Sequence, residues 1–114
     1  MLLAEKVAVV TGGAGLNGLG FATARMMAEQ GARVVILDLE RAQPAAAAAR
    51  LGERHIGIAA DVTDKASCER AAQAIVGQCG RIDILVNNAG VTQPRKTADI
   101  SAQVLEVSGV DGAE

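Results

Sequence analysis

Short apolar runs alternate with amphipathic stretches along most of the chain. The runs have the length of strands buried on both faces, and they cover residues 7–10, 34–37, 56–60 and 82–86. Helical spacing of apolar residues predicts helices between them, over residues 18–30, 44–51 and about 64–78. Glycines at 31, 52 and 80 stand where helices commonly stop. This alternation predicts a three-layer α/β fold with about four parallel strands in the order 3-2-1-4 and helices on both faces.

The same periodicity predicts which helix faces meet the sheet. In the first helix the apolar face is expected to carry Leu19, Ala22, Met26 and Met27. In the third helix one stripe carries Cys68, Ala71, Ala72, Ile75 and Cys79. Eleven residues of helix separate the two cysteines by about 16 Å, too far for a disulfide, so both thiols are expected to fill the core. His55 is expected at the surface or sheet edge, and Asp83 in a turn.

Composition narrows the possible functions. With 50% hydrophobic and 21% charged residues, the 114-residue chain is expected to be one small globular domain. A net charge of −2 argues against nucleic acid and anionic membranes as partners. No apolar run approaches the roughly 20 residues of a membrane span, the first residues carry no signal-peptide pattern, and no ligand spacing indicates a metal. We therefore expect a cytoplasmic protein.

Each predicted strand ends in residues suited to a nucleotide. The first runs into a glycine-rich loop, Thr11-Gly12-Gly13-Ala14-Gly15-Leu16-Asn17-Gly18-Leu19-Gly20. Such a loop lets the chain turn from strand to helix, and the helix then offers unpaired N–H groups to a pyrophosphate. The loop does not fit the compact GxGxxG spacing, so an ordinary flexible turn is the alternative reading.

Asp38 ends the second strand, 18 residues after Gly20. An acid at about this distance bonds the adenosine ribose in dinucleotide-binding folds, and its charge repels the 2′-phosphate of NADP. The position therefore favours NAD over NADP. Arg41 is the one feature that would favour NADP, and a helix-capping acid is the alternative reading of Asp38.

Together with Asp61-Val62 and Asn87-Asn88-Ala89-Gly90, these motifs resemble the amino-terminal half of a classical short-chain dehydrogenase/reductase. The resemblance covers about residues 6–107 and implies a truncated, Rossmann-type NAD(P)-binding domain, with a family-like core over 1–97 and a divergent tail over 98–114. It also implies the cofactor-binding residues, from the pyrophosphate to the nicotinamide end: Gly12, Asn17, Gly18, Leu19, Asp38, Leu39, Asp61, Val62, Asn88, Ala89 and Gly90. A structural role for Asn87 and Asn88, tying neighbouring strands together, remains equally open.

Two departures from the family pattern limit the inference. Leu16 and Asn17 lengthen the usual TGxxxGxG loop by two residues, and the chain contains no tyrosine. The family's proton transfer uses a tyrosine with a lysine four residues later, so no catalytic residue is assigned here. One reading is the cofactor half of an NAD-dependent oxidoreductase that moves hydride between an alcohol and a ketone. The alternative is a non-catalytic NAD-binding module, or a remnant, that self-associates through its exposed sheet edge.

Overall fold

A computed structural model describes residues 2–15 and 18–88, and they form the predicted parallel sheet. Its strands pair in the order β3-β2-β1-β4, and every neighbouring pair is parallel. The strands are β1 (Val7–Thr11), β2 (Arg33–Asp38), β3 (Ile56–Ala59) and β4 (Ile84–Asn87). The predicted strand order is confirmed.

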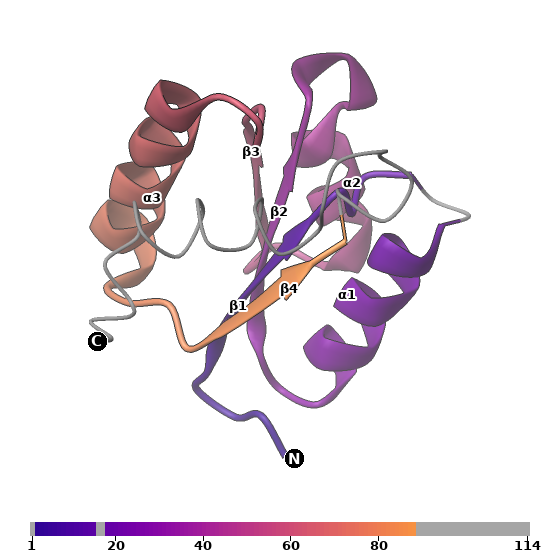
Figure 1. The fold of residues 1–114 in the computed structure, drawn as a ribbon. Helices are drawn as coiled ribbons and strands as arrows, with labels where there is room; N and C mark the ends of the chain where they lie inside the picture. Colours follow the sequence, from indigo (N-terminus) through magenta and orange to yellow (C-terminus); the bar gives the residue numbers. More distant parts are fainter. Residues whose placement is uncertain (1, 16–17, 89–114) are drawn as a thin grey trace.

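Three α-helices cover the two faces of the sheet. Helices α1 (Leu19–Glu29) and α2 (Pro44–Leu51) lie on one side, and α3 (Lys65–Cys79) lies on the other (Figure 1). A short 3₁₀ turn, η1 (Glu40–Ala42), precedes α2 and was not predicted. The three glycines at 31, 52 and 80 follow the helices with positive φ angles, a conformation that glycine adopts at little cost.

The sheet separates two apolar cores. Ala8, Val10, Val34 and Ile36 face α1 and α2, whereas the alternate residues of β1 and β2 face α3. The central strands are therefore buried on both faces, which explains why they read as continuous apolar runs.

Helix α1 turns a different face to the sheet from the one that its largest apolar residues predict. Gly20, Phe21 and Ala24 are buried, with Met27 packed against the same core, whereas Leu19 is 75% exposed and Met26 66% exposed. The prediction for Leu19, Ala22 and Met26 is wrong. Small residues at positions 20 and 24 allow the helix backbone to approach the sheet, and this close packing decides which face is buried.

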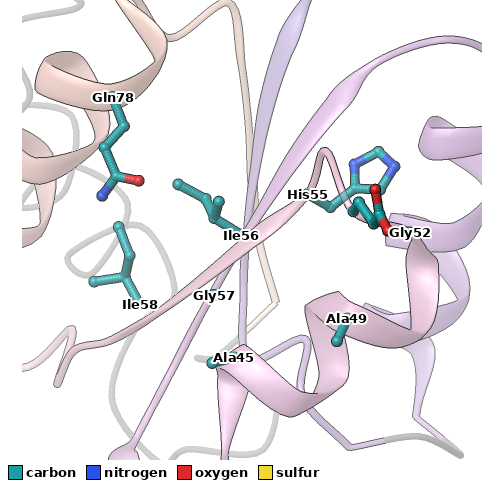
Figure 2. A pocket seen from close by; sticks show the side chains of 9 residues that line it. Ala45, Ala49, Gly52, His55, Ile56, Gly57, Ile58 and Gln78 are labelled. Carbon is teal, nitrogen blue, oxygen red and sulfur yellow. The ribbon is translucent and has the colours of Figure 1, made fainter.

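Gly57 brings α2 against the edge strand. Figure 2 shows β3 passing directly beside the helix that carries Ala45 and Ala49. A Cβ atom at position 57 would overlap the carbonyl group of Pro44, the first residue of that helix. The helix can therefore rest on the strand only because residue 57 has no side chain.

His55 lies at the sheet edge, one of the two positions that the sequence predicted, but it is buried and not at the surface. It lies just before β3 at 9% exposure, and its Nδ1 accepts a hydrogen bond of 3.0 Å from the backbone N–H of Val34 in β2. The imidazole thus takes the place of a strand carbonyl where the β2–β3 pairing begins. Burial lowers the pKa of His55, and the positive charges of Arg54 and Arg33 lower it further.

The position of His55 predicts that acid weakens the fold. The pKa of His55 in the folded state lies below the unfolded value of about 6.5. The stabilisation that neutral His55 gives the fold is therefore complete above that pH and declines as the pH falls. We expect the free energy of unfolding to drop by up to about 1.4 kcal/mol per pH unit below about pH 6.5. Urea denaturation followed by circular dichroism between pH 7.5 and 5 measures this slope. His55→Asn, which keeps an acceptor near Nδ1 but does not titrate, should flatten it; an equal slope in both proteins would contradict the assignment.

The predicted core stripe of α3 is largely confirmed. Cys68, Ala71, Ala72 and Ile75 are buried, and the partly buried Cys79 packs against the same core. Both cysteines are free, and burial, with the nearby Asp61 and Asp64, raises the pKa of the Cys68 thiol. Cys68 is therefore an unreactive core residue.

Asp83 directly precedes β4 and lies outside any turn, unlike the sequence prediction. Its Oδ2 accepts the Val7 N–H at 2.8 Å and pairs with Arg81, and its own N–H donates to the Val7 carbonyl. The bond from Val7 lowers the pKa of the Asp83 carboxyl, and Arg81 adds to this effect. Asp83 thus fixes β4 against the start of β1.

Candidate functional site

The turn after β1 begins at Gly12. This residue has a φ angle of 69°, and its N–H donates to the carbonyl of Leu37 in β2 at 2.7 Å. The glycine therefore supplies the left-handed conformation needed where the chain leaves the sheet, as the sequence predicts.

Gly20 lets α1 start directly above this turn. A Cβ atom there would lie 2.6 Å from the Gly12 carbonyl oxygen and 2.7 Å from Nδ2 of Asn88. Both distances are too short for any side chain. The predicted close approach of helix and sheet at Gly20 is confirmed.

Asp38 joins the end of β2 to the glycine-rich loop. Its Oδ2 accepts the N–H of Ala14 at 3.1 Å, and its Oδ1 accepts the N–H of Leu39 at 2.8 Å. The side chain remains partly exposed at the carboxyl edge of the sheet. The carboxylate is thus held in a fixed orientation beside the loop, with lone pairs left for further donors.

A second link joins the ends of β1 and β4. The fully buried Thr11 hydroxyl donates to Oδ1 of Asn87 at 2.9 Å and accepts the N–H of Asn88 at 2.9 Å. Nδ2 of Asn88 donates to the Gly12 carbonyl at 3.2 Å. The two asparagines therefore do tie neighbouring strands together, which was one of the two readings of this motif.

Asp61 and Val62 follow β3 at the same edge of the sheet. The Ala60 N–H donates to the Asp38 carbonyl at 2.8 Å, which places this segment beside the end of β2. Oδ1 of Asp61 accepts both the N–H and the hydroxyl of Thr63, whereas Val62 is buried. The Asp61 side chain thus shapes the turn that leads into α3.

The amino end of α1 differs from that of α3. Asp64 caps α3 with its side chain, whereas Gly18 precedes α1 and supplies no side-chain hydrogen bond. Leu19, the first residue of α1, is largely exposed at this end. The N-cap residue of α1 therefore supplies no side-chain acceptor to the first N–H groups of this helix.

The described residues gather most of the predicted site at one edge. Hydrogen bonds connect the ends of all four strands through Gly12, Asp38, Ala60 and Asn88. Asn17, Ala89 and Gly90 lie outside the described residues. The sequence prediction did not identify the bonding roles of Ala14 and Thr11, although a threonine ending a buried apolar strand was a signal.

Chemically, this edge offers the Asp38 carboxylate as an acceptor, the amino end of α1 without a side-chain cap, and backbone turns. Among residues 2–15 and 18–88, no three His, Cys, Asp or Glu side chains gather as metal ligands. In the same part of the chain, each helix is too short or too polar to cross a membrane. The arrangement suits a ligand that carries both hydroxyl and phosphate groups.

Known proteins resemble the chain over most of its length. Residues 6–108 match the family model for short chain dehydrogenase. An uncharacterized short-chain type dehydrogenase/reductase of Sinorhizobium fredii is 48% identical over 105 residues, which are 89% of this chain and 42% of that protein. D-threitol dehydrogenase of Mycolicibacterium smegmatis is 46% identical over 101 residues, which are 86% of this chain and 38% of the relative.

A solved structure has the same architecture. The crystal structure of a short chain dehydrogenase from Mycobacterium smegmatis superposes with a TM-score of 0.78 at 28% identity, covering 93% of this chain and 51% of that one. The chain thus spans about two-fifths of the length of the curated relatives described above. The family-model match, the sheet order and these similarities together show that the chain belongs to the short chain dehydrogenase family.

Proposed function

We propose that the chain binds NAD across the carboxyl edge of its sheet. The observation that carries this proposal is the position of Asp38, whose carboxylate lies beside the glycine-rich loop and is bonded to Ala14. A carboxylate there can accept hydrogen bonds from both ribose hydroxyls of adenosine while the pyrophosphate lies against the adjoining helix.

The uncapped start of α1 supports the pyrophosphate position. Gly12 and Gly18 keep the backbone free of side chains there, and the helix provides N–H donors and a partial positive charge. Asn17 and Leu19 belong to the same proposed contact region. Leu16 and Asn17, which lengthen the loop, lie outside the described residues, so the proposal names the helix end and not the individual N–H donors.

The remaining proposed contacts follow the strand ends outward. Leu39 meets the adenosine, and Asp61 and Val62 flank the adenine. Asn88, Ala89 and Gly90 line the nicotinamide side. In this proposal Asn88 has two roles, because it also holds the Gly12 carbonyl.

Isothermal titration calorimetry with NAD and NADP tests the cofactor assignment. We expect tighter binding of NAD, because the Asp38 charge repels a 2′-phosphate. Asp38→Ala should weaken NAD binding by about tenfold to a hundredfold, the loss expected from one or two charge-assisted hydrogen bonds. Glu40→Ala, which removes a nearby exposed carboxylate, is the matched control and should change little. Tighter binding of NADP by the unmutated chain would contradict the proposal.

For the whole protein we propose NAD-dependent hydride transfer between an alcohol and a ketone, in the cytoplasm. Family membership supports this reaction class, and relatives such as D-threitol dehydrogenase carry names of the same kind. The 114 residues supply the cofactor half of that reaction. They contain no tyrosine to transfer the hydroxyl proton, so the proposal assigns no catalytic residue among them.

A second candidate is a non-catalytic NAD-binding module that self-associates. Within the described residues, β1 is the sole strand paired with β4, and an unpaired apolar edge can pair with another chain. We expect the purified 114-residue chain to elute as a dimer or larger species in size-exclusion chromatography. With NAD and a panel of secondary alcohols it should show no change in NADH absorbance. Turnover by a monomeric preparation would refute both expectations.

A further inference from the structure

A hollow lies at the opposite end of the sheet from the proposed cofactor site. It has a volume of about 410 Å³ and opens between the last turns of α1 and α2 and the start of β3. Its walls are formed by Arg25, Ala28, Glu29, Arg50, Leu51 and His55.

The two arginines of this hollow, Arg25 and Arg50, form no ion pair with the one acidic residue that lines it, Glu29. Arg25 lies 5.5 Å from the centre of the Phe21 ring, a contact that orients its guanidinium group. Arg81–Asp83 is the one salt bridge within residues 2–15 and 18–88, so Glu29 forms an ion pair with neither arginine of the hollow. The lining thus contains two guanidinium groups and one carboxylate, which gives the hollow a net positive charge.

His55 adds a buried donor at the same place. Because Nδ1 accepts the Val34 N–H, the neutral ring carries its proton on Nε2. The side chain is nine-tenths buried, and within the described residues no partner accepts this Nε2–H. Figure 2 shows the ring from a neighbouring hollow that His55 also lines, at the start of β3 beside Gly52, and Nε2 is the nitrogen near that glycine. A largely buried donor without a protein acceptor is uncommon, so this Nε2–H is available to a ligand oxygen.

Two further arginines, Arg33 and Arg54, lie near His55, and each donates a hydrogen bond to a backbone carbonyl. Arg33 donates to the Arg54 carbonyl, and Arg54 donates to the Gly31 carbonyl. Both side chains act on the His55 ring as positive charges. This end of the sheet is therefore electropositive around a neutral donor, the arrangement that favours an anion.

We propose that the hollow between α1 and α2 binds a small oxyanion of the phosphate type. Arg25 and Arg50 provide planar forks of N–H donors that match tetrahedral oxygens, and His55 donates through Nε2. This site is separate from the carboxyl edge of the sheet and does not depend on NAD binding there.

Because His55 is the single histidine of the chain, nuclear magnetic resonance can observe the site directly. Inorganic phosphate is titrated near pH 8, where the imidazole is neutral, and the ring Cε1–H signal is followed. We expect a saturable shift with phosphate and none with sodium chloride at equal ionic strength. A linear shift, an equal shift with chloride, or no shift would overturn the proposal.

Charge-removing variants then locate the anion. Arg25→Gln and Arg50→Gln should each weaken phosphate binding by about tenfold or more. Arg70→Gln, an exposed arginine on α3, is the matched control and should bind as the parent does. All three substitutions are at exposed positions, and circular dichroism verifies folding. Binding that is unchanged in both hollow variants would mean that phosphate shifts His55 from elsewhere, which also overturns the site.

Discussion

Gly57→Ala is expected to destabilise the protein by about 3 kcal/mol or more, at the upper end of the cost of overpacking a core. The added methyl group would overlap the backbone carbonyl of Pro44, which is not the movable end of a side chain. Either α2 must lift from β3 or the edge strand must shift, and each change separates buried contacts. Urea denaturation monitored by far-ultraviolet circular dichroism measures the loss without requiring tryptophan, which the chain lacks.

Gly77→Ala is the matched control for this prediction. Gly77 lies on the exposed side of α3, and a Cβ atom there would meet nothing within 4 Å. Alanine is the better helix former by about 1 kcal/mol, so this variant should be slightly more stable than the parent. If the two variants changed stability in the same direction by similar amounts, the contact between Pro44 and Gly57 would not control the packing of α2.

The sheet could be predicted from the sequence because each of its signals is local. An apolar run, a following polar or glycine residue and a helical period together mark each strand and each crossover. Right-handed crossovers then leave few possible strand orders. The same local signals placed Asp38 and Asn88 at one edge, because parallel strands all end there.

The orientation of α1 could not be predicted in the same way. Leu19 and Met26 are apolar but exposed, whereas the smaller Gly20 and Ala24 are buried. Hydrophobicity favours burying the large residues, whereas close packing against a sheet favours the small ones. The second effect prevails here because the Gly12 turn and Asn88 approach α1 so closely at Gly20.

The long-range hydrogen bonds at the two ends of the sheet could not be predicted from local sequence patterns either. Asp38 bonds Ala14 across 24 residues, and His55 bonds Val34 across 21. Both donors are backbone N–H groups, of Ala14 and Val34, so the side chains of these residues give no sign of the bond. The sequence indicates that Asp38 and His55 are polar side chains able to accept hydrogen bonds. Only the folded structure identifies the backbone N–H group that each one accepts.

Thr11→Val is expected to cost about 2–4 kcal/mol of stability, since it removes a buried hydroxyl that donates to Asn87 and accepts from Asn88. Valine has nearly the same shape, so the loss reports hydrogen bonding more than volume. The buried N–H of Asn88 would lose its acceptor, and Oδ1 of Asn87 would lose the Thr11 donor. The end of β4 should then loosen from β1.

Thr11→Ser separates the contribution of the hydroxyl to stability from that of the methyl group. Serine keeps both hydrogen bonds and loses only one buried methyl group, so it should cost about 1 kcal/mol. Urea denaturation of the three proteins measures their free energies of unfolding, which should fall in the order parent, serine variant, valine variant. Because Asn88 also holds the Gly12 carbonyl, the valine variant should bind NAD more weakly as well, if the proposed site is correct. A valine variant as stable as the serine variant would show that the hydroxyl contributes no more than the methyl group, which contradicts the prediction.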